Sequence, residues 1–140
     1  MNQELKTEIF GFFKETQPVY LSTVDGNKPR VRPVTLIYFD DNFWIATGSS
    51  DAKMKQLSQN DNIEFCLPIK DDRNMGYIRA AGKAEIVEKT EDKQLILDNI
   101  DFISYFWKEA ADPGYALLKI DIQEIEYLPI GQMLATRMKV

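Results

Sequence analysis

The chain has 140 residues, a formal net charge of −5 and 44% hydrophobic residues, which suits one domain with a buried core and argues against disorder. It contains no histidine and a single cysteine, Cys66, which excludes Ser-His-Asp and Cys-His catalysis, histidine-based zinc motifs, a histidine haem ligand and an internal disulfide. We expect one domain over residues 1–140, no metal site, no nucleic-acid or membrane partner and, because no targeting segment is visible, a cytoplasmic location.

In the first half of the chain, a helical apolar period gives way to strand-like segments. The apolar residues of segment 2–16 recur at helical spacing, which places them on one buried face. A hairpin signal at Asp25-Gly26-Asn27 separates the first two strands. The predicted elements are a helix over 2–16, strands over 19–24, 28–39, 43–47 and 63–69, and a short helix over 51–59.

The second half predicts two more strands around a helical region. A long strand over 77–89 contains Gly82, which is typical of a bulge or bend. A helical region over 90–111, with a possible break near Asn99, precedes a last strand over 115–128, and the tail is left unassigned. Six strands joined mostly by short turns, without βαβ alternation, predict a mainly β fold: an antiparallel barrel with flanking helices.

Basic residues gather in one part of this acidic chain. Residues 28–55 contain five basic and three acidic side chains, a local charge of +2, whereas the rest of the chain carries −7. Within this part, alternation along the strand places Arg30 and Arg32 on one face and Val31 on the opposite, core-like face. The arginines fit either two solvated side chains or a grip on a phosphate group.

The turn after the third strand, Ala46 to Lys53, is a second candidate for anion binding. Gly48 allows a ligand to approach the backbone, Ser49 and Ser50 offer hydroxyls, and the following helix presents free N–H groups. The alternative is an ordinary serine N-cap. Lys53 lies in the first helical turn, where the helix dipole disfavours a cation. A bound anion would offset that cost, so replacing Lys53 by alanine should leave the ligand-free fold equally or more stable.

Four stretches share their order and spacing with a known family. They are the hairpin VYLSTVDGNKPRVRPV, the segment Arg32-Pro33-Val34, the Thr47-to-Lys53 spacing and the later strand GYIRAAGKA. In these stretches the chain resembles the flavin-binding split barrels of the pyridoxamine 5′-phosphate oxidase-like superfamily, particularly the general-stress-protein-26-like branch. The resemblance covers residues 19–87, with a weaker match over 112–127.

The resemblance implies a six-stranded split barrel and a homodimer that holds FMN at its interface. By this resemblance Arg32 and Lys53 hold the FMN phosphate, Thr47 supports the turn or contacts the cofactor, and main chain near Val34 and Thr35 meets the pyrimidine edge of the flavin. Together with the serines of the turn, the predicted cofactor-binding residues are Arg32, Pro33, Val34, Thr35, Thr47, Ser49, Ser50 and Lys53.

The chain also departs from the family pattern. Asp51-Ala52 stands where the oxidases carry Ser-Arg, and no C-terminal segment bearing arginine and histidine is present, so we do not expect a true pyridoxamine 5′-phosphate oxidase. The expected function is that of a flavin-dependent oxidoreductase with an unknown small-molecule substrate and no assigned catalytic residue. The alternatives are a non-catalytic, stress-related flavin carrier or sensor, and a barrel that has exchanged FMN for deazaflavin or haem.

Two aromatic positions each fit more than one role. Trp44 lies on a predicted strand and fits either core packing or contact with a flavin. Tyr105-Phe106-Trp107 forms a cluster late in the helical region, and this cluster fits core packing, a dimer contact or a lid over the flavin.

Overall fold

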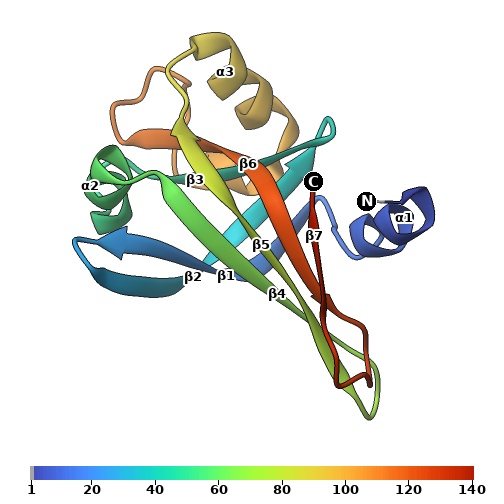
Figure 1. Ribbon diagram of the computed structural model, residues 1–140. Coiled ribbons are helices and arrows are strands. Elements are labelled where there is room, and N and C mark those ends of the chain that lie inside the picture. Colours follow the sequence, from blue (N-terminus) through green and yellow to red (C-terminus); the bar gives the residue numbers. More distant parts are fainter. Residues whose placement is uncertain (1) are drawn as a thin grey trace.

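The computed structural model describes residues 2–140 and shows a seven-stranded antiparallel sheet rolled into a barrel (Figure 1). The strand order is β3-β2-β1-β4-β5-β6-β7, and an additional pairing of β3 with β6 closes the barrel. The strands are β1 (Thr16–Asp25), β2 (Lys28–Phe39), β3 (Asn42–Gly48), β4 (Asn62–Lys70), β5 (Met75–Ile86), β6 (Tyr115–Leu128) and β7 (Thr136–Lys139). The predicted mainly β barrel is confirmed. The seventh strand lies in the unassigned tail, where Thr136 to Lys139 pair with the end of β6.

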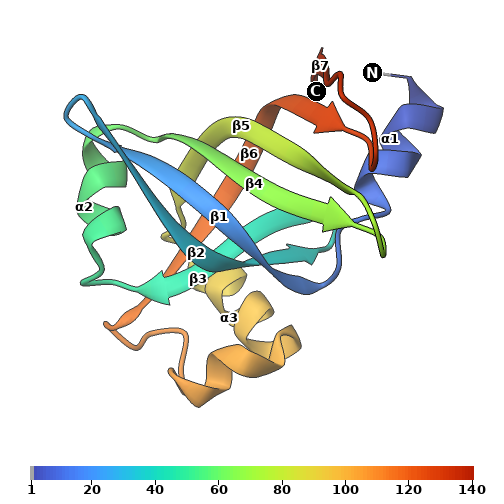
Figure 2. The ribbon, with the colours of Figure 1, turned by 90° about the horizontal axis from the view of Figure 1, so that it is seen from below.

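Three α-helices flank the barrel: α1 (Gln3–Phe10), α2 (Ala52–Gln59) and α3 (Thr90–Asn99), followed by a 3₁₀ turn, η1 (Asp101–Tyr105). Figure 2 shows α2 beside the β1–β2 hairpin and α1 at the opposite end of the barrel. None of the helices within residues 2–140 is long and apolar enough to cross a membrane.

Helix α1 ends earlier than the predicted segment 2–16. Gly11 terminates it, and the Gly11 N–H donates to the Thr7 carbonyl. The chain then turns so that Thr16 can pair with Ile37 of β2. The predicted break near Asn99 is confirmed, because Ile100 is extended and separates α3 from η1.

The bulge predicted at Gly82 is also confirmed. The register between β5 and β6 shifts between Ala81 and Gly82. A side-chain Cβ at Gly82 would collide with the main-chain oxygen of Asp121 on β6. This position therefore requires glycine because two backbones approach each other here.

The core consists of two clusters on opposite sides of the barrel wall. The first fills the barrel and packs against α1, whereas the second lies between the wall and α3. Trp44 belongs to the second cluster, is 3% exposed and donates its indole N–H to the Phe39 carbonyl, so core packing is the one of its two predicted roles that the structure shows. The prediction that Val31 faces the core is wrong. Ile37, on the same strand face, is buried under α3, but α3 does not extend to Val31, which is 70% exposed.

Candidate functional site at the split between β2 and β3

The barrel is split between β2 and β3. The two strands pair only next to their connecting turn, from Ile37 to Phe39 on β2, and then diverge toward α2 (Figure 2). No strand among residues 2–140 pairs with this edge of β2 over residues 28–36, so its main-chain groups remain open on that side. Charged side chains from β2 and from the start of α2 lie at this split.

Lys53 is the buried cation of the split. It lies in the first turn of α2, is 4% exposed, and its Nζ donates to the Thr47 hydroxyl over 2.7 Å. The same Nζ lies 3.0 Å from the Asp51 carboxylate. Asp51 is also the N-cap of α2, since its side chain accepts a hydrogen bond from the Lys53 main-chain N–H. Lysine is rarely buried without a partner. Here both Thr47 and Asp51 are partners of the ammonium group.

Arg32 approaches from β2 and is held by Gln56, one turn after Lys53 in α2. Its Nη1 donates to the Leu21 carbonyl over 3.3 Å and its Nη2 donates to the Gln56 side-chain oxygen over 3.0 Å. The same oxygen of Gln56 accepts a 2.6 Å hydrogen bond from Thr23, whose side chain is fully buried in β1. Arg32 therefore points to the barrel side of β2, not to a solvated outer face.

The charges of these residues influence one another. Burial lowers the pKa of Arg32, and the Asp51 carboxylate acts in the opposite direction. Burial alone would raise the pKa of Asp51, but hydrogen bonds from Lys53 and the charges of Lys53 and Arg32 outweigh it and leave that pKa below its ordinary value. The structure thus brings Arg32 of β2 together with Thr47 and Lys53, which follow it by fifteen residues or more, in one group that we call the anion pocket (Arg32, Thr47, Asp51, Lys53 and Gln56).

The donors of the anion pocket fit a phosphate group. A guanidinium has five N–H groups and an ammonium has three. Two N–H groups of Arg32 and two of Lys53 have partners, so both cations retain donors that no group within residues 2–140 uses. Both are suited to an oxyanion.

The turn before α2 is anchored to a distant loop. The Ser49 hydroxyl donates to the Pro113 carbonyl over 2.6 Å and the Ser49 N–H donates to the Gly114 carbonyl. Ser50 is exposed, and a Cβ added to Gly48 would meet nothing within 4 Å. The turn is therefore open at Gly48, while the hydrogen of the Ser49 hydroxyl is already donated within the protein. Cofactor contacts from Ser49 and Ser50 stay predictions.

The predicted strand residues lie on both faces of β2. Val34 packs against the barrel core, whereas Pro33 and Thr35 are exposed on the outer face. All three lie along the open edge of β2. This placement agrees with a main-chain contact to a ligand in the split, and that contact also stays a prediction.

The sequence pattern did not identify Gln56 and Thr23 as parts of the pocket. Gln56 follows Lys53 by three residues in α2, and residues three apart lie on the same helix face. This spacing is the signal that could have linked Gln56 to the lysine. Thr23 carries no comparable signal, since only the fold shows that it is buried.

The aromatic cluster lies beside the anchored loop. The Trp107 ring stacks on Tyr115 with centroids 5.3 Å apart, and Tyr115 directly follows Gly114, which accepts the bond from the turn. Trp107 therefore packs in the second core cluster, whereas Phe106 is 67% exposed and Tyr105 is exposed as well.

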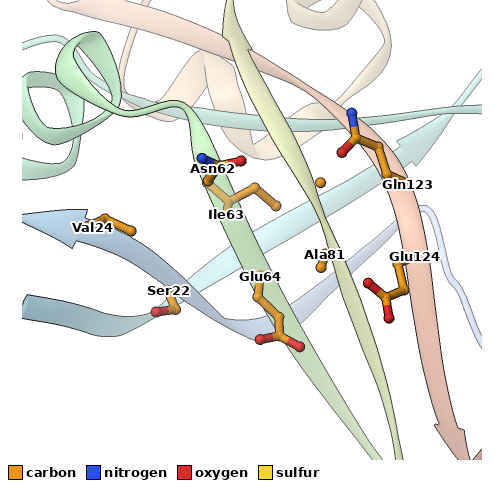
Figure 3. Close-up of a pocket in the computed structure, with 9 residues that line it drawn as sticks. Ser22, Val24, Asn62, Ile63, Glu64, Ala81, Gln123 and Glu124 are labelled. Atoms are coloured by element: carbon orange, nitrogen blue, oxygen red, sulfur yellow. The ribbon is translucent and has the colours of Figure 1, made fainter. Parts of the chain in front are cut away.

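A separate hollow of about 320 Å³ lies on the outer face of β1, β4, β5 and β6 (Figure 3). It contains the carboxylates of Glu64 and Glu124 and the uncharged side chains of Ser22 and Asn62. The residues that line it include no cation. The charge of this hollow does not suit phosphate, so the anion pocket is the stronger candidate site.

Comparisons with solved structures find the same fold in known proteins. The crystal structure of general stress protein 26 from Bacillus anthracis has a TM-score of 0.77 and 23% identity, covering 99% of this chain and 100% of that chain. An FAD-binding protein from Mesorhizobium loti has a TM-score of 0.71 and 14% identity, covering 94% and 96%. A haem-binding protein from Mycobacterium smegmatis has a TM-score of 0.72 and 13% identity, covering 89% of this chain and 53% of that chain.

At these identities the structural likeness shows the fold alone. No curated protein sequence matches the chain. The sequence model for pyridoxamine 5′-phosphate oxidase, however, matches residues 5–129, which is most of the chain. The resemblance noted in the sequence is therefore confirmed, and the chain belongs to the pyridoxamine 5′-phosphate oxidase family of split barrels.

Proposed function

We propose that this protein binds FMN in the split between β2 and β3 and acts as a flavin-dependent oxidoreductase on a small molecule. The convergence of Arg32 and Lys53 carries the proposal. These cations come from different elements, both act on the Asp51 carboxylate and keep unused N–H donors. The family match and the FAD-binding protein of the same fold support a flavin as the ligand.

The chain's own residues would bind and orient the cofactor. Arg32 and Lys53 would hold the phosphate, Thr47 would keep the Lys53 ammonium in place, and the open edge of β2 near Val34 and Thr35 would offer main-chain groups to the flavin ring. A bound flavin supplies the electron-transfer chemistry, while the protein supplies position and electrostatics.

We further propose that the protein works as a homodimer with the cofactor at the interface, and we keep the cytoplasmic location as a prediction. The outer face of β1 and β2, next to the pocket, supports the dimer. On this face Val31 is 70% exposed and Tyr20 is 51% exposed. Burying apolar side chains of this size against a second chain removes them from water, which stabilises the dimer.

The test is a titration of the purified protein with FMN and with riboflavin, which lacks the phosphate. FMN should bind at least tenfold more tightly, since the cations address the phosphate and each tenfold corresponds to about 1.4 kcal/mol. Equal affinities would overturn the phosphate assignment. The visible spectrum of the purified protein identifies any cofactor that remains bound and distinguishes a flavin from haem.

A non-catalytic flavin carrier is the second candidate. The position of Tyr77 favours it, because this potential proton donor gives its hydroxyl hydrogen to Glu126 on β6 and is not part of the anion pocket. Reduction of the FMN-loaded protein by NADH or NADPH, followed by a panel of acceptors, decides between the two. Turnover supports the enzyme, and bound flavin without turnover supports the carrier.

A further inference from the structure

The anion pocket contains an anion of its own. Arg32 and Lys53 contribute two positive charges and Asp51 contributes one negative charge, which leaves a net charge of +1. The other pocket residues, Thr47 and Gln56, are uncharged. The nearest ion pair along the same hairpin, Arg30 with Asp25 at 3.2 Å, is self-contained at the β1–β2 turn.

The cap of α2 does not require the negative charge of Asp51. Its capping role requires only a side-chain oxygen that accepts the Lys53 N–H, and asparagine or serine caps helices about as well as aspartate. The negative charge does have a second effect, because it lies 3.0 Å from the Lys53 ammonium and also acts on Arg32. Any phosphate bound by these two cations would therefore approach Asp51 as well.

A phosphate monoester carries one negative charge below pH ~6 and two above it. The first charge is matched by a pocket of net charge +1. The second charge is attracted by the cations but repelled by Asp51. We infer that Asp51 sets the charge selectivity of the anion pocket, because it reduces the advantage of a doubly charged phosphate monoester over a singly charged phosphate. This inference rests on the proposed function.

The pH dependence of FMN binding measures this selectivity directly. The chain has no histidine, so no side chain has an ordinary pKa near that of the FMN phosphate. The Asp51 pKa lies below its ordinary value, and burial raises the pKa of the Cys66 thiol, so neither group titrates between pH 5 and 7.5. A difference in this pH response between the parent and a variant at Asp51 therefore reports how Asp51 acts on the second charge of the phosphate.

The experiment compares FMN affinity at pH 5 and at pH 7.5 in the parent, Asp51→Asn and Asp51→Ser. Both substitutions keep a helix cap and remove the charge. Asp25→Asn is the matched control, because it removes a carboxylate that pairs with the exposed Arg30. Riboflavin, titrated in parallel, reports any effect of pH on binding of the ring.

In the parent, FMN should bind only about threefold more tightly at pH 7.5 than at pH 5. In both Asp51 variants this ratio should be about tenfold larger, as expected for removal of one like-charge repulsion. Asp25→Asn should behave as the parent does, and riboflavin should not respond. If FMN remains preferred over riboflavin but the ratio is the same in all variants, the inference is wrong and the proposed function stands. If FMN is not preferred over riboflavin in any variant, both are wrong.

Discussion

The carboxylate of Asp51 lies 3.0 Å from the ammonium of Lys53, two residues further along the chain, and the same oxygen accepts the Lys53 main-chain N–H. One side chain thereby caps α2 and neutralises the cation in its first turn. The sequence had suggested that Lys53 is an unfavourable cation that awaits a ligand. The structure shows that Asp51 already offsets it, so the expected effect of removing Lys53 changes sign.

We predict that Lys53→Ala destabilises the ligand-free protein by about 1–3 kcal/mol, because a buried stem and the hydrogen bond to Thr47 are lost. Lys53→Met keeps most of the buried stem and should recover at least half of this loss. Urea unfolding without cofactor measures both. An unchanged or increased free energy of unfolding in Lys53→Ala would restore the expectation drawn from the sequence.

Arg32 and Arg30 form a natural pair for testing the phosphate site. They share a strand face, yet only Arg32 reaches the anion pocket, whereas Arg30 pairs with Asp25 in solvent. Arg32→Ala should weaken FMN by about ten- to a hundredfold, as expected for loss of a charge-assisted bond of about 1.5–3 kcal/mol. Arg30→Ala should leave the affinity unchanged. Calorimetric titration decides, and equal losses in both variants would indicate a general charge effect.

The proposed dimer should depend on the outer face of β1 and β2. We predict that Val31→Glu converts the dimer to a monomer, because a charge would be buried at the centre of the apolar contact. Phe106→Glu, at an exposed aromatic far along the chain, is the control and should remain dimeric. Light scattering at micromolar concentration measures the mass. A dimer lost only in Phe106→Glu would assign the interface to the aromatic cluster instead.

Two buried tyrosines should make the protein sensitive to alkali. Burial raises the pKa of Tyr115 to about 12, and burial with a hydrogen bond to Glu8 raises that of Tyr127 to about 12. In the unfolded chain a tyrosine titrates near 10. The folded state thus holds these protons more tightly. The contribution of the two tyrosines to the free energy of unfolding is fully present below pH 10 and is lost as the pH rises toward 12.

For Tyr115 this decline should be roughly 1 kcal/mol for each pH unit above 10. Tyr115→Phe should be less stable at pH 8, since it loses the hydrogen bond to the Lys93 carbonyl, but its stability should fall less steeply with pH. Tyr105→Phe, which changes an exposed ring, should follow the parent. Urea unfolding at pH 8, 10 and 11 provides the comparison, and identical slopes in all three proteins would contradict the assignment.

Much of the fold was predictable because it depends on local patterns. Alternating apolar residues identified six of the seven strands, Asp25-Gly26 identified the first hairpin, and Gly82 marked the bulge. The short β7 escaped prediction because it has four residues, which are mostly exposed and show no apolar alternation, although it pairs with β6 directly before it in the chain.

The sequence by itself determined which residues alternate, where the chain turns, and that Arg32 and Lys53 are cations on neighbouring elements. Only the tertiary structure decided what covers each face and which charges meet. Val31 and Ile37 share a strand face because they are an even number of residues apart, but α3 covers only the end at Ile37. Likewise, the split between β2 and β3 brings Arg32 to the helix that Asp51 caps, because burial and Coulomb interactions depend on distances in space that spacing along a chain does not specify.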